Sequence, residues 1–71
     1  MKINNELFRL IRVSRRMTQR DFAKLIGYSH ALVSHIETDI KPVSGEVSDA
    51  VIRQCNLNND DIRRYKEILR L

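Results

Sequence analysis

Apolar residues recur along this chain at intervals of three and four, the period that places side chains on one face of an α-helix. The first such pattern lies within residues 5–15, where Leu7, Leu10 and Ile11 share a face with Phe8. Arginines occupy several of the remaining positions. The pattern therefore predicts an amphipathic helix over about residues 5–15, with its apolar face turned to the core.

Residues 18–38 predict two short helices joined by a tight turn. Thr18 can cap the first helix, because its hydroxyl can accept a hydrogen bond from the backbone of Asp21, three residues later. Gly27 ends this helix, since glycine adopts the left-handed conformation of a chain reversal without steric cost. Ser29 then caps the second helix. The residues that the second helix turns outward are His30, Ala31, Ser34 and His35.

The remainder of the chain predicts two further helices. Pro42 closes a loop, a helix begins near Ser44, and Asn56 ends it. Another start signal follows, because Asn58 can cap a helix that has Asp61 at its third position. No segment alternates with a period of two. The predicted fold class is therefore all-α, with five helices.

The two helices within residues 18–38 resemble the helix-turn-helix of the Cro/lambda-repressor family, also called the XRE family. Counted from Gln19, the family motif has a small residue fifth, a glycine ninth, and branched apolar residues fifteenth and eighteenth. Those positions hold Ala23, Gly27, Val33 and Ile36. The resemblance covers about residues 5–60 and implies a lambda-repressor-like fold. We therefore expect residues 1–71 to form one helix-turn-helix domain.

One departure from the family pattern lies just before the helix that Thr18 caps. Many members have glycine there, whereas this chain has Arg16. A left-handed conformation costs an arginine about 1 kcal/mol relative to glycine. We interpret Arg16 as a local departure from the family sequence pattern, which leaves the exact geometry of this turn open.

Length and charge narrow the class of protein. The 71 residues allow one domain with one modest core. Thirteen lysines and arginines face nine aspartates and glutamates, and the net charge of +4 favours a polyanionic partner. The single Cys55 rules out an internal disulfide, and without a signal peptide we expect a cytoplasmic protein. No apolar run is long enough to span a membrane.

The resemblance also implies which residues read DNA. The second helix of the motif would lie in the major groove, with its N-terminal turn and outer face against base edges. Serine and histidine can exchange hydrogen bonds with bases, and an alanine methyl can contact a thymine methyl. A solvated helix face is the alternative interpretation. The base-contacting residues implied are Ser29, His30, Ala31, Ser34 and His35.

A second set of residues is expected to contact DNA phosphates. Gln19 opens a helix whose unpaired amides and positive dipole end suit a phosphate, and the family places this glutamine at the DNA backbone. Such contacts supply affinity and register rather than sequence choice. The phosphate-contacting residues we predict are Thr18, Gln19, Arg20 and Lys41, with Arg15 and Arg16 as further candidates.

Glu37 is expected to support the structure rather than contact bases. It lies near the C-terminal end of the reading helix, where the helix dipole disfavours a negative charge, so it needs a cation. Arg12 is the partner we expect, and the family has the same pairing at these positions. Ala23, where the helices cross closely, and Gly27, at the turn, are the other structural residues.

Neither a metal site nor an active site is indicated. His30 and His35 diverge by about 140° on a helix, and no Cys-x-x-Cys or His-x-x-x-His spacing exists. No nucleophile, base and orienting group cluster, and no glycine loop cradles a phosphate. We expect Cys55 to be a small buried residue, with no cofactor, no metal and no small-molecule ligand.

These features predict a sequence-specific regulator of transcription that binds double-stranded DNA, either a phage- or plasmid-type repressor or a short XRE regulator. One module reads few base pairs, so we expect a homodimer on a near-palindromic operator with half-sites about 34 Å apart. The predicted dimer surface is the fifth helix, residues 59–71, and core closure is the alternative role for the same side chains. Those side chains are Ile62, Tyr65, Ile68, Leu69 and Leu71.

A protein-interaction module, such as an antirepressor or antitoxin-like adaptor, is the alternative function. It would require an apolar stripe on the outer face of the reading helix. Leu32 is the one residue there that suits it, and packing on the fourth helix is the alternative role for Leu32. The small polar residues around Leu32 favour DNA.

Overall fold

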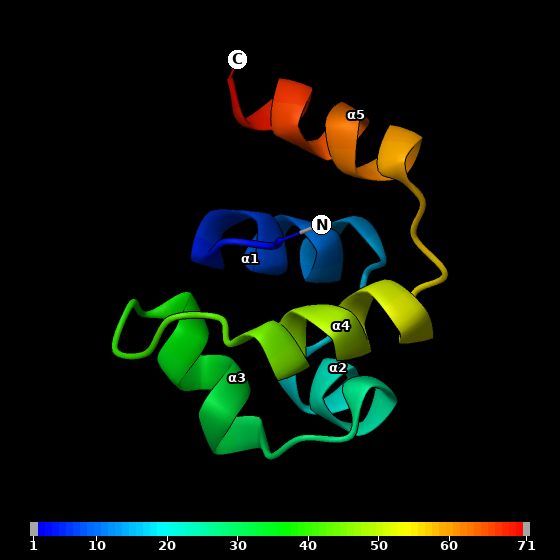
Figure 1. Ribbon diagram of the computed structural model, residues 1–71. Helices are drawn as coiled ribbons and strands as arrows, with labels where there is room; N and C mark the ends of the chain where they lie inside the picture. The colour runs from blue at the N-terminus through cyan, green and yellow to red at the C-terminus, as the bar shows by residue number, and fades with distance from the viewer. Residues whose placement is uncertain (1, 71) are drawn as a thin grey trace.

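The computed structural model describes residues 2–70 and contains five α-helices (Figure 1). No strand occurs among these residues, so the prediction of an all-α, lambda-repressor-like fold with five helices is confirmed. None of the described helices is long and apolar enough to cross a membrane. The helices are α1 (Asn5–Ser14), α2 (Gln19–Ile26), α3 (His30–Glu37), α4 (Gly45–Gln54) and α5 (Asn59–Leu69).

A side-chain cap fixes the start of each helix. In all five, the side chain of the residue before the helix accepts a hydrogen bond from the backbone N–H three residues later. Such a cap contributes about 1 kcal/mol, and the starts predicted from Thr18, Ser29, Ser44 and Asn58 are confirmed. The cap of α5 is a complete capping box, because Asp61 also accepts from the backbone N–H of Asn58.

Residues in the left-handed conformation turn the chain after four of the helices. Gly27 follows α2 with φ 82°, and Arg16 follows α1 with φ 56°. Arg16 therefore adopts the left-handed conformation at the position where many family members have glycine. Asn56, which we predicted to end the fourth helix, has φ 53°. Asp39, at φ 62°, is a fourth such residue that the sequence did not predict. Only Gly27 avoids the steric penalty entirely.

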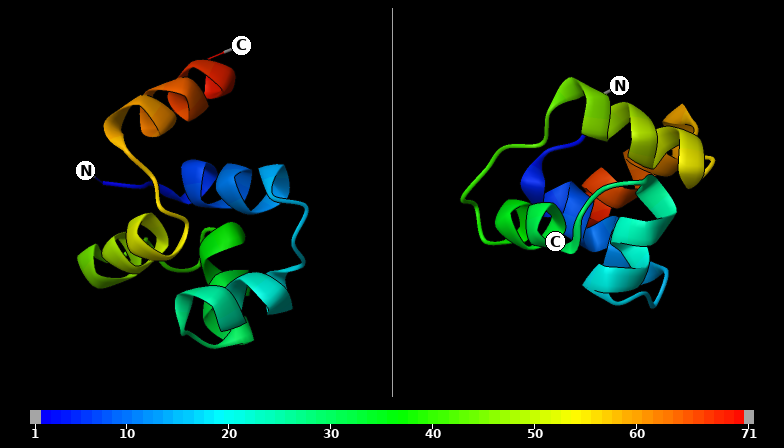
Figure 2. Two further views of the ribbon diagram at one scale, coloured as in Figure 1. Left: turned by 90° about the vertical axis from the view of Figure 1, so that its right-hand side faces the viewer. Right: turned by 90° about the horizontal axis from the view of Figure 1, so that it is seen from below.

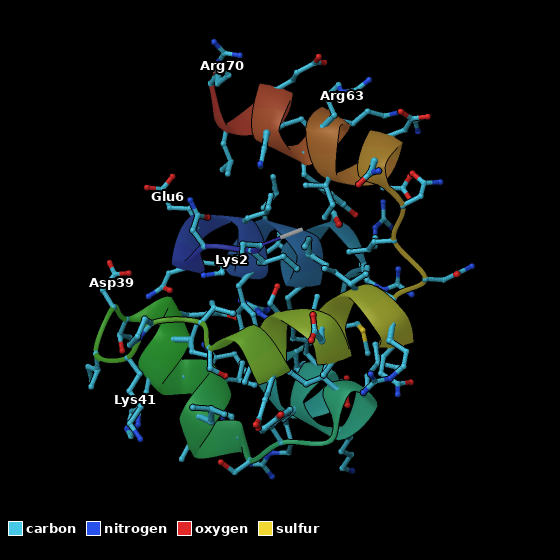
Figure 3. All side chains as sticks on the ribbon, in the orientation of Figure 1. Lys2, Glu6, Asp39, Lys41, Arg63 and Arg70 are labelled. Atoms are coloured by element: carbon cyan, nitrogen blue, oxygen red, sulfur yellow. The ribbon has the colours of Figure 1, made fainter. Side chains whose placement is uncertain are left out.

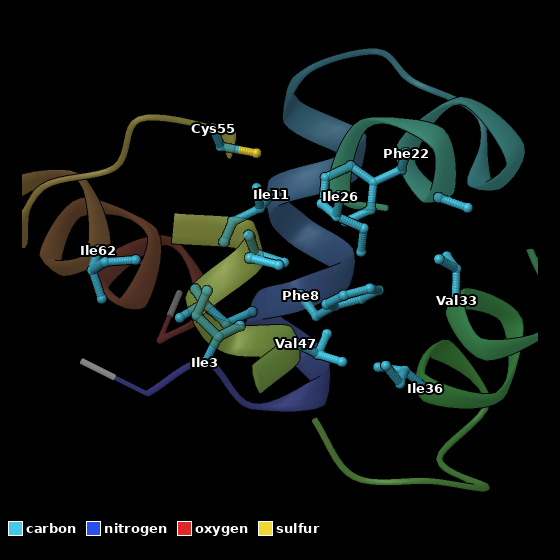
Figure 4. Packing of buried hydrophobic residues seen from close by; sticks show 14 residues of the cluster. Ile3, Phe8, Ile11, Phe22, Ile26, Val33, Ile36, Val47, Cys55 and Ile62 are labelled. Carbon is cyan, nitrogen blue, oxygen red and sulfur yellow. The ribbon is translucent and has the colours of Figure 1, made fainter. Parts of the chain in front are cut away.

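The core forms where α1, α2, α3 and α4 meet. The rings of Phe8 and Phe22 pack edge to face at its centre, 5.2 Å between centroids and 81° between planes. Val33 and Ile36, the motif's branched apolar residues, are fully buried and lie on the side of α3 that faces the core (Figure 4). Burying these side chains fixes α3 against α1 and α2, and so fixes which face of α3 is left to solvent.

The helix α5 lies on the side of α1 that faces away from α2 and α3 (Figures 1 and 2). It packs on α1 through Ile62, and the Tyr65 hydroxyl lies 2.8 Å from that of Ser14. Ile62 is only 4% exposed and belongs to the core, which is the alternative role expected from the sequence for the apolar side chains of this helix. Leu71, also predicted for the dimer surface, lies outside the described residues.

Candidate nucleic-acid interface

The turn between α2 and α3 is built around the carbonyl of Ala23. The backbone N–H groups of Gly27 and Tyr28 both donate to it, at 2.9 and 3.0 Å, which closes α2 and redirects the chain. Ala23 itself is buried, and its small side chain lets the two helices approach closely. The two helices therefore form one rigid unit with a single exposed outer face on α3.

The predicted base-reading residues lie together on this outer face. Ser29, His30 and Ala31 are exposed, while Ser34 and His35 are half-buried. The hydroxyl of Ser29 accepts from the backbone N–H of Leu32 at 3.1 Å, so part of its hydrogen-bonding capacity is already used by the cap. The outer face thus carries polar or small side chains from the N-cap of α3 to its last turn. In helix-turn-helix complexes, the N-terminal residues of the corresponding helix contact base edges in the major groove.

The predicted pairing of Arg12 with Glu37 is present. The guanidinium donates from Nε to Glu37 Oε2 at 2.7 Å and from Nη2 to Oε1 at 2.8 Å. Its third contact runs from Nη1 to the backbone carbonyl of Met17 at 2.8 Å. The Glu37 side chain is 3% exposed, so the pair is largely removed from solvent. Arg12 therefore ties α1, the loop before α2 and the end of α3 to one another.

Gln19 takes part in this network, which the sequence did not predict. Its amide Nε2 donates to Glu37 Oε1 at 3.1 Å, and its Oε1 lies 3.3 Å from Nε2 of His30. Gln19, which we predicted to contact a phosphate, thus already uses one of its side-chain amide hydrogens in a bond within the protein. A buried carboxylate can accept about four hydrogen bonds, more than one arginine supplies, and that surplus was the signal for a second donor.

Asn5 holds the loop that follows α3. Its side-chain amide donates to Asp39 Oδ1 at 3.1 Å and to the backbone carbonyl of Lys41 at 2.9 Å, and its Oδ1 accepts from the backbone N–H of Val43 at 3.2 Å. The side chain of Lys41 is exposed and points away from the body of the protein beside α3 (Figure 3). The backbone that carries this cation is therefore fixed to the first turn of α1.

The phosphate candidates lie at two places around α3. Thr18, Gln19 and Arg20 are at the N-terminal end of α2, which the contact of Gln19 with His30 joins to the first turn of α3. Lys41 follows the C-terminal end of α3. The hydroxyl of Thr18 accepts from the backbone N–H of Asp21 at 3.0 Å, so Thr18 serves primarily as a cap. Arg20, at the start of α2, and Lys41, in the loop after α3, are both exposed, and neither forms an ion pair with another residue in the range 2–70.

Cys55 is buried at the C-terminal end of α4. Burial raises the pKa of its thiol above the ordinary value of 9.0, and the charge of Arg15 acts in the opposite direction. Within residues 2–70, no three histidine, cysteine, aspartate or glutamate side chains are placed to hold a metal ion. Cys55 thus contributes packing, as its position in the core cluster indicates.

The helix-turn-helix domain family matches this chain over residues 6–65, from the first turn of α1 into α5. This match is consistent with the resemblance to Cro/lambda-repressor proteins seen in the motif. Comparison with curated proteins found no match, and comparison with solved structures found none either.

Proposed function

Because the chain belongs to the helix-turn-helix domain family, which indicates a DNA-binding regulator, we propose that it is a sequence-specific regulator of transcription. In this proposal α3 lies in the major groove of double-stranded DNA, as the second helix of a helix-turn-helix does. The protein then acts as a phage- or plasmid-type repressor or as a short XRE regulator. A binding role agrees with a family that is typically non-enzymatic.

The observation that carries the proposal is the outer face of α3. Its residues are polar or small, exposed Arg20 and Lys41 lie at the start of α2 and in the loop after α3, and the buried pair of Arg12 and Glu37 joins α3 to α1. We propose direct base contacts for Ser29, His30, Ala31, Ser34 and His35. Arg20 and Lys41 would contact phosphates, together with the backbone of Thr18 and Gln19 at the start of α2.

The protein-partner alternative loses its main support in the structure. Leu32, the apolar residue that suited such a partner, is half-buried and packs against the core. What remains exposed on α3 is polar or small, which suits a groove lined with hydrogen-bonding groups.

We propose further that two copies pair through the outer surface of α5 and the adjoining part of α1. Ile68, on α5, is 51% exposed, and Val13 and Leu69 are further exposed apolar residues on α1 and α5. Leu10, Val13 and Leu69 also contribute the apolar part of a groove of about 410 Å³. A pair of this kind would place two α3 helices on a near-palindromic operator, with half-sites about 34 Å apart.

Selection of bound duplexes from a random DNA pool at near-physiological salt tests the function. The wild type should enrich a palindromic consensus, and a Ser34→Ala/His35→Ala double variant should relax it. Lys41→Ala should weaken binding to all sequences alike and reduce the salt dependence by about one counterion. Lys24→Ala, which removes an exposed cation from α2, is the matched control and should change neither. Retention that is salt-sensitive but blind to sequence would contradict the proposal.

Sedimentation velocity tests the dimer. Ile68→Asp should shift the wild-type dimer toward monomer, because a charge would be buried at the interface. Ile40→Asp is the control, since Ile40 is also an exposed apolar residue but lies in the loop after α3. A wild type that is monomeric at all concentrations, and remains so on operator DNA, would contradict pairing.

A further inference from the structure

A chain of hydrogen bonds leads from the buried carboxylate of Glu37 to the exposed ring of His30. The first link runs from Gln19 Nε2 to Glu37 Oε1 at 3.1 Å, and the second joins Gln19 Oε1 to His30 Nε2 at 3.3 Å. Arg12 closes the buried end, because it donates to both oxygens of Glu37. A residue at the predicted DNA surface is thereby connected to a fixed charge pair in the interior.

The buried end fixes the direction of every bond in this chain. Both oxygens of Glu37 accept hydrogen bonds from the Arg12 guanidinium, as those of an ionised carboxylate do. Because an ionised carboxylate has no hydrogen to donate, Glu37 must also be the acceptor in its bond with Gln19. Gln19 must therefore turn its NH₂ group toward Glu37 and its carbonyl oxygen toward His30. A carbonyl oxygen is only an acceptor, so the Nε2 atom of His30 must carry the hydrogen. In the neutral ring, Nδ1 is then the unprotonated nitrogen.

We propose that Glu37, acting through Gln19, sets the tautomer of His30, so that neutral His30 offers Nδ1 to DNA solely as a hydrogen-bond acceptor. The inference rests on the proposed function, since it takes His30 to be a base-reading residue. Within residues 2–70 no hydrogen bond of Nδ1 is recorded, which leaves this atom for a base. Gln19 and Glu37 are positioning residues in this scheme, and neither touches the base itself.

The fixed tautomer selects a class of base. In the major groove adenine displays its N6 amino group and cytosine its N4 amino group, and both are donors. Guanine and thymine display carbonyl acceptors at the corresponding edge, and these would face the unprotonated Nδ1 without a hydrogen. A histidine whose tautomer is not fixed could form a hydrogen bond with a base of either class, as acceptor from adenine or cytosine and as donor to guanine or thymine. The chain from Glu37 therefore gives His30 a preference for adenine or cytosine, of roughly ten-fold per site.

Replacing Gln19 by lysine reverses the polarity of the chain. A lysine ammonium is only a donor, so it can donate to Glu37 and to His30 Nε2, which must then be the unprotonated nitrogen. The hydrogen of the neutral ring moves to Nδ1, which becomes a donor toward DNA. Gln19→Met, which keeps a chain of similar length but has neither group, removes the constraint. His35 has no such chain within the described residues and serves as the internal control.

Two measurements test the inference near pH 8, where an ordinary histidine is about fully neutral. Long-range ¹H–¹⁵N correlation spectra of the free protein identify the protonated nitrogen of each ring. We expect Nε2–H at His30 in the wild type, Nδ1–H in Gln19→Lys and a mixture in Gln19→Met, with His35 unchanged. Amide spectra establish that each variant is folded. A His30 tautomer that stays the same in both variants overturns the proposal.

Selection from a random DNA pool supplies the second measurement. The base preference lost in His30→Ala should be adenine or cytosine in the wild type, and should change to guanine or thymine in Gln19→Lys. A selective wild type whose preference does not follow the tautomer overturns this inference and leaves the proposed function standing. A wild type without any sequence selectivity overturns both the inference and the proposed function. The tautomer measurement does not depend on this result, because it is made on the free protein.

Discussion

Asn5 and Lys41 are joined across the fold by a 2.9 Å hydrogen bond from the side-chain amide of Asn5 to the backbone carbonyl of Lys41. The same side chain also holds Asp39 and Val43, so a single residue at the start of α1 shapes the loop that leaves α3. The cation proposed to contact a phosphate after the reading helix is therefore carried on a backbone anchored to another helix. Its position does not depend on the loop's own stiffness.

Asn5→Ala should loosen this loop without disturbing the core. We expect unfolding free energy to fall by about 1 kcal/mol and DNA affinity to fall a few-fold for all sequences alike. A double-mutant cycle with Lys41→Ala, measured by titration of operator DNA, checks the reason. The two effects on binding should not add, because Asn5 acts on binding through Lys41. Full additivity would show that the anchor and the cation act separately.

Removing one member of the buried ion pair should be severe. Arg12→Ala leaves Glu37 buried without its two guanidinium hydrogen bonds. Glu37→Ala leaves the Arg12 guanidinium without its carboxylate partner. Urea unfolding should show either change lowering stability by about 3–5 kcal/mol. Arg9→Ala is the matched control, since Arg9 lies 3.8 Å from the same carboxylate but its side chain is 64% exposed. It should cost less than about 1 kcal/mol, and an equal loss in both arginine variants would contradict the assignment.

Arg16→Gly should stabilise the protein. Arg16 has φ 56°, and glycine adopts that conformation at about 1 kcal/mol less than a residue with a β-carbon. Thermal or urea unfolding should show a gain of about this size. The neighbouring Arg15→Gly is the control, because Arg15 has φ −90° and its replacement by glycine should lower stability. If both variants were destabilised, the left-handed turn would not be the source of strain.

The buried thiol makes stability depend on alkaline pH. Burial raises the pKa of Cys55 above 9.0, so the folded state keeps the thiol neutral where the unfolded chain ionises. The corresponding stabilisation is complete below pH 9.0 and is lost as pH rises through the raised pKa. Between about pH 8 and about pH 10, the wild type should therefore lose more unfolding free energy than Cys55→Ala. Parallel pH curves for the two proteins would show that the thiol is not coupled to folding.

Local sequence signals predicted the elements of this fold well. Each of the caps Thr18, Ser29, Ser44 and Asn58 bonds to a residue only three positions away, so the sequence alone contains both partners. The turn at Gly27 and the burial of Val33 and Ile36 follow from the motif in the same way.

Contacts between distant residues were harder to predict. Asn5 reaches Lys41 over 36 positions, and Gln19 reaches Glu37 over 18, so both contacts depend on how whole helices pack. The same limit applies to α5, where Ile62 and Ile68 share an apolar character in the sequence. Only the packing against α1 separates the buried Ile62 from the exposed Ile68. The pair of Arg12 and Glu37 was predictable because a carboxylate at a helix C-terminus requires a cation.

The position of α1 between α3 and α5 has an evolutionary consequence. Both outer helices pack on α1 from different sides, so a substitution on the exposed face of one does not alter the exposed face of the other. Under the proposed function, a duplicated gene could acquire a new operator through changes in α3 while its product still exchanged subunits with the parent. Changes in α5 alone would end that exchange and separate the two regulatory circuits without altering the DNA that either one recognises.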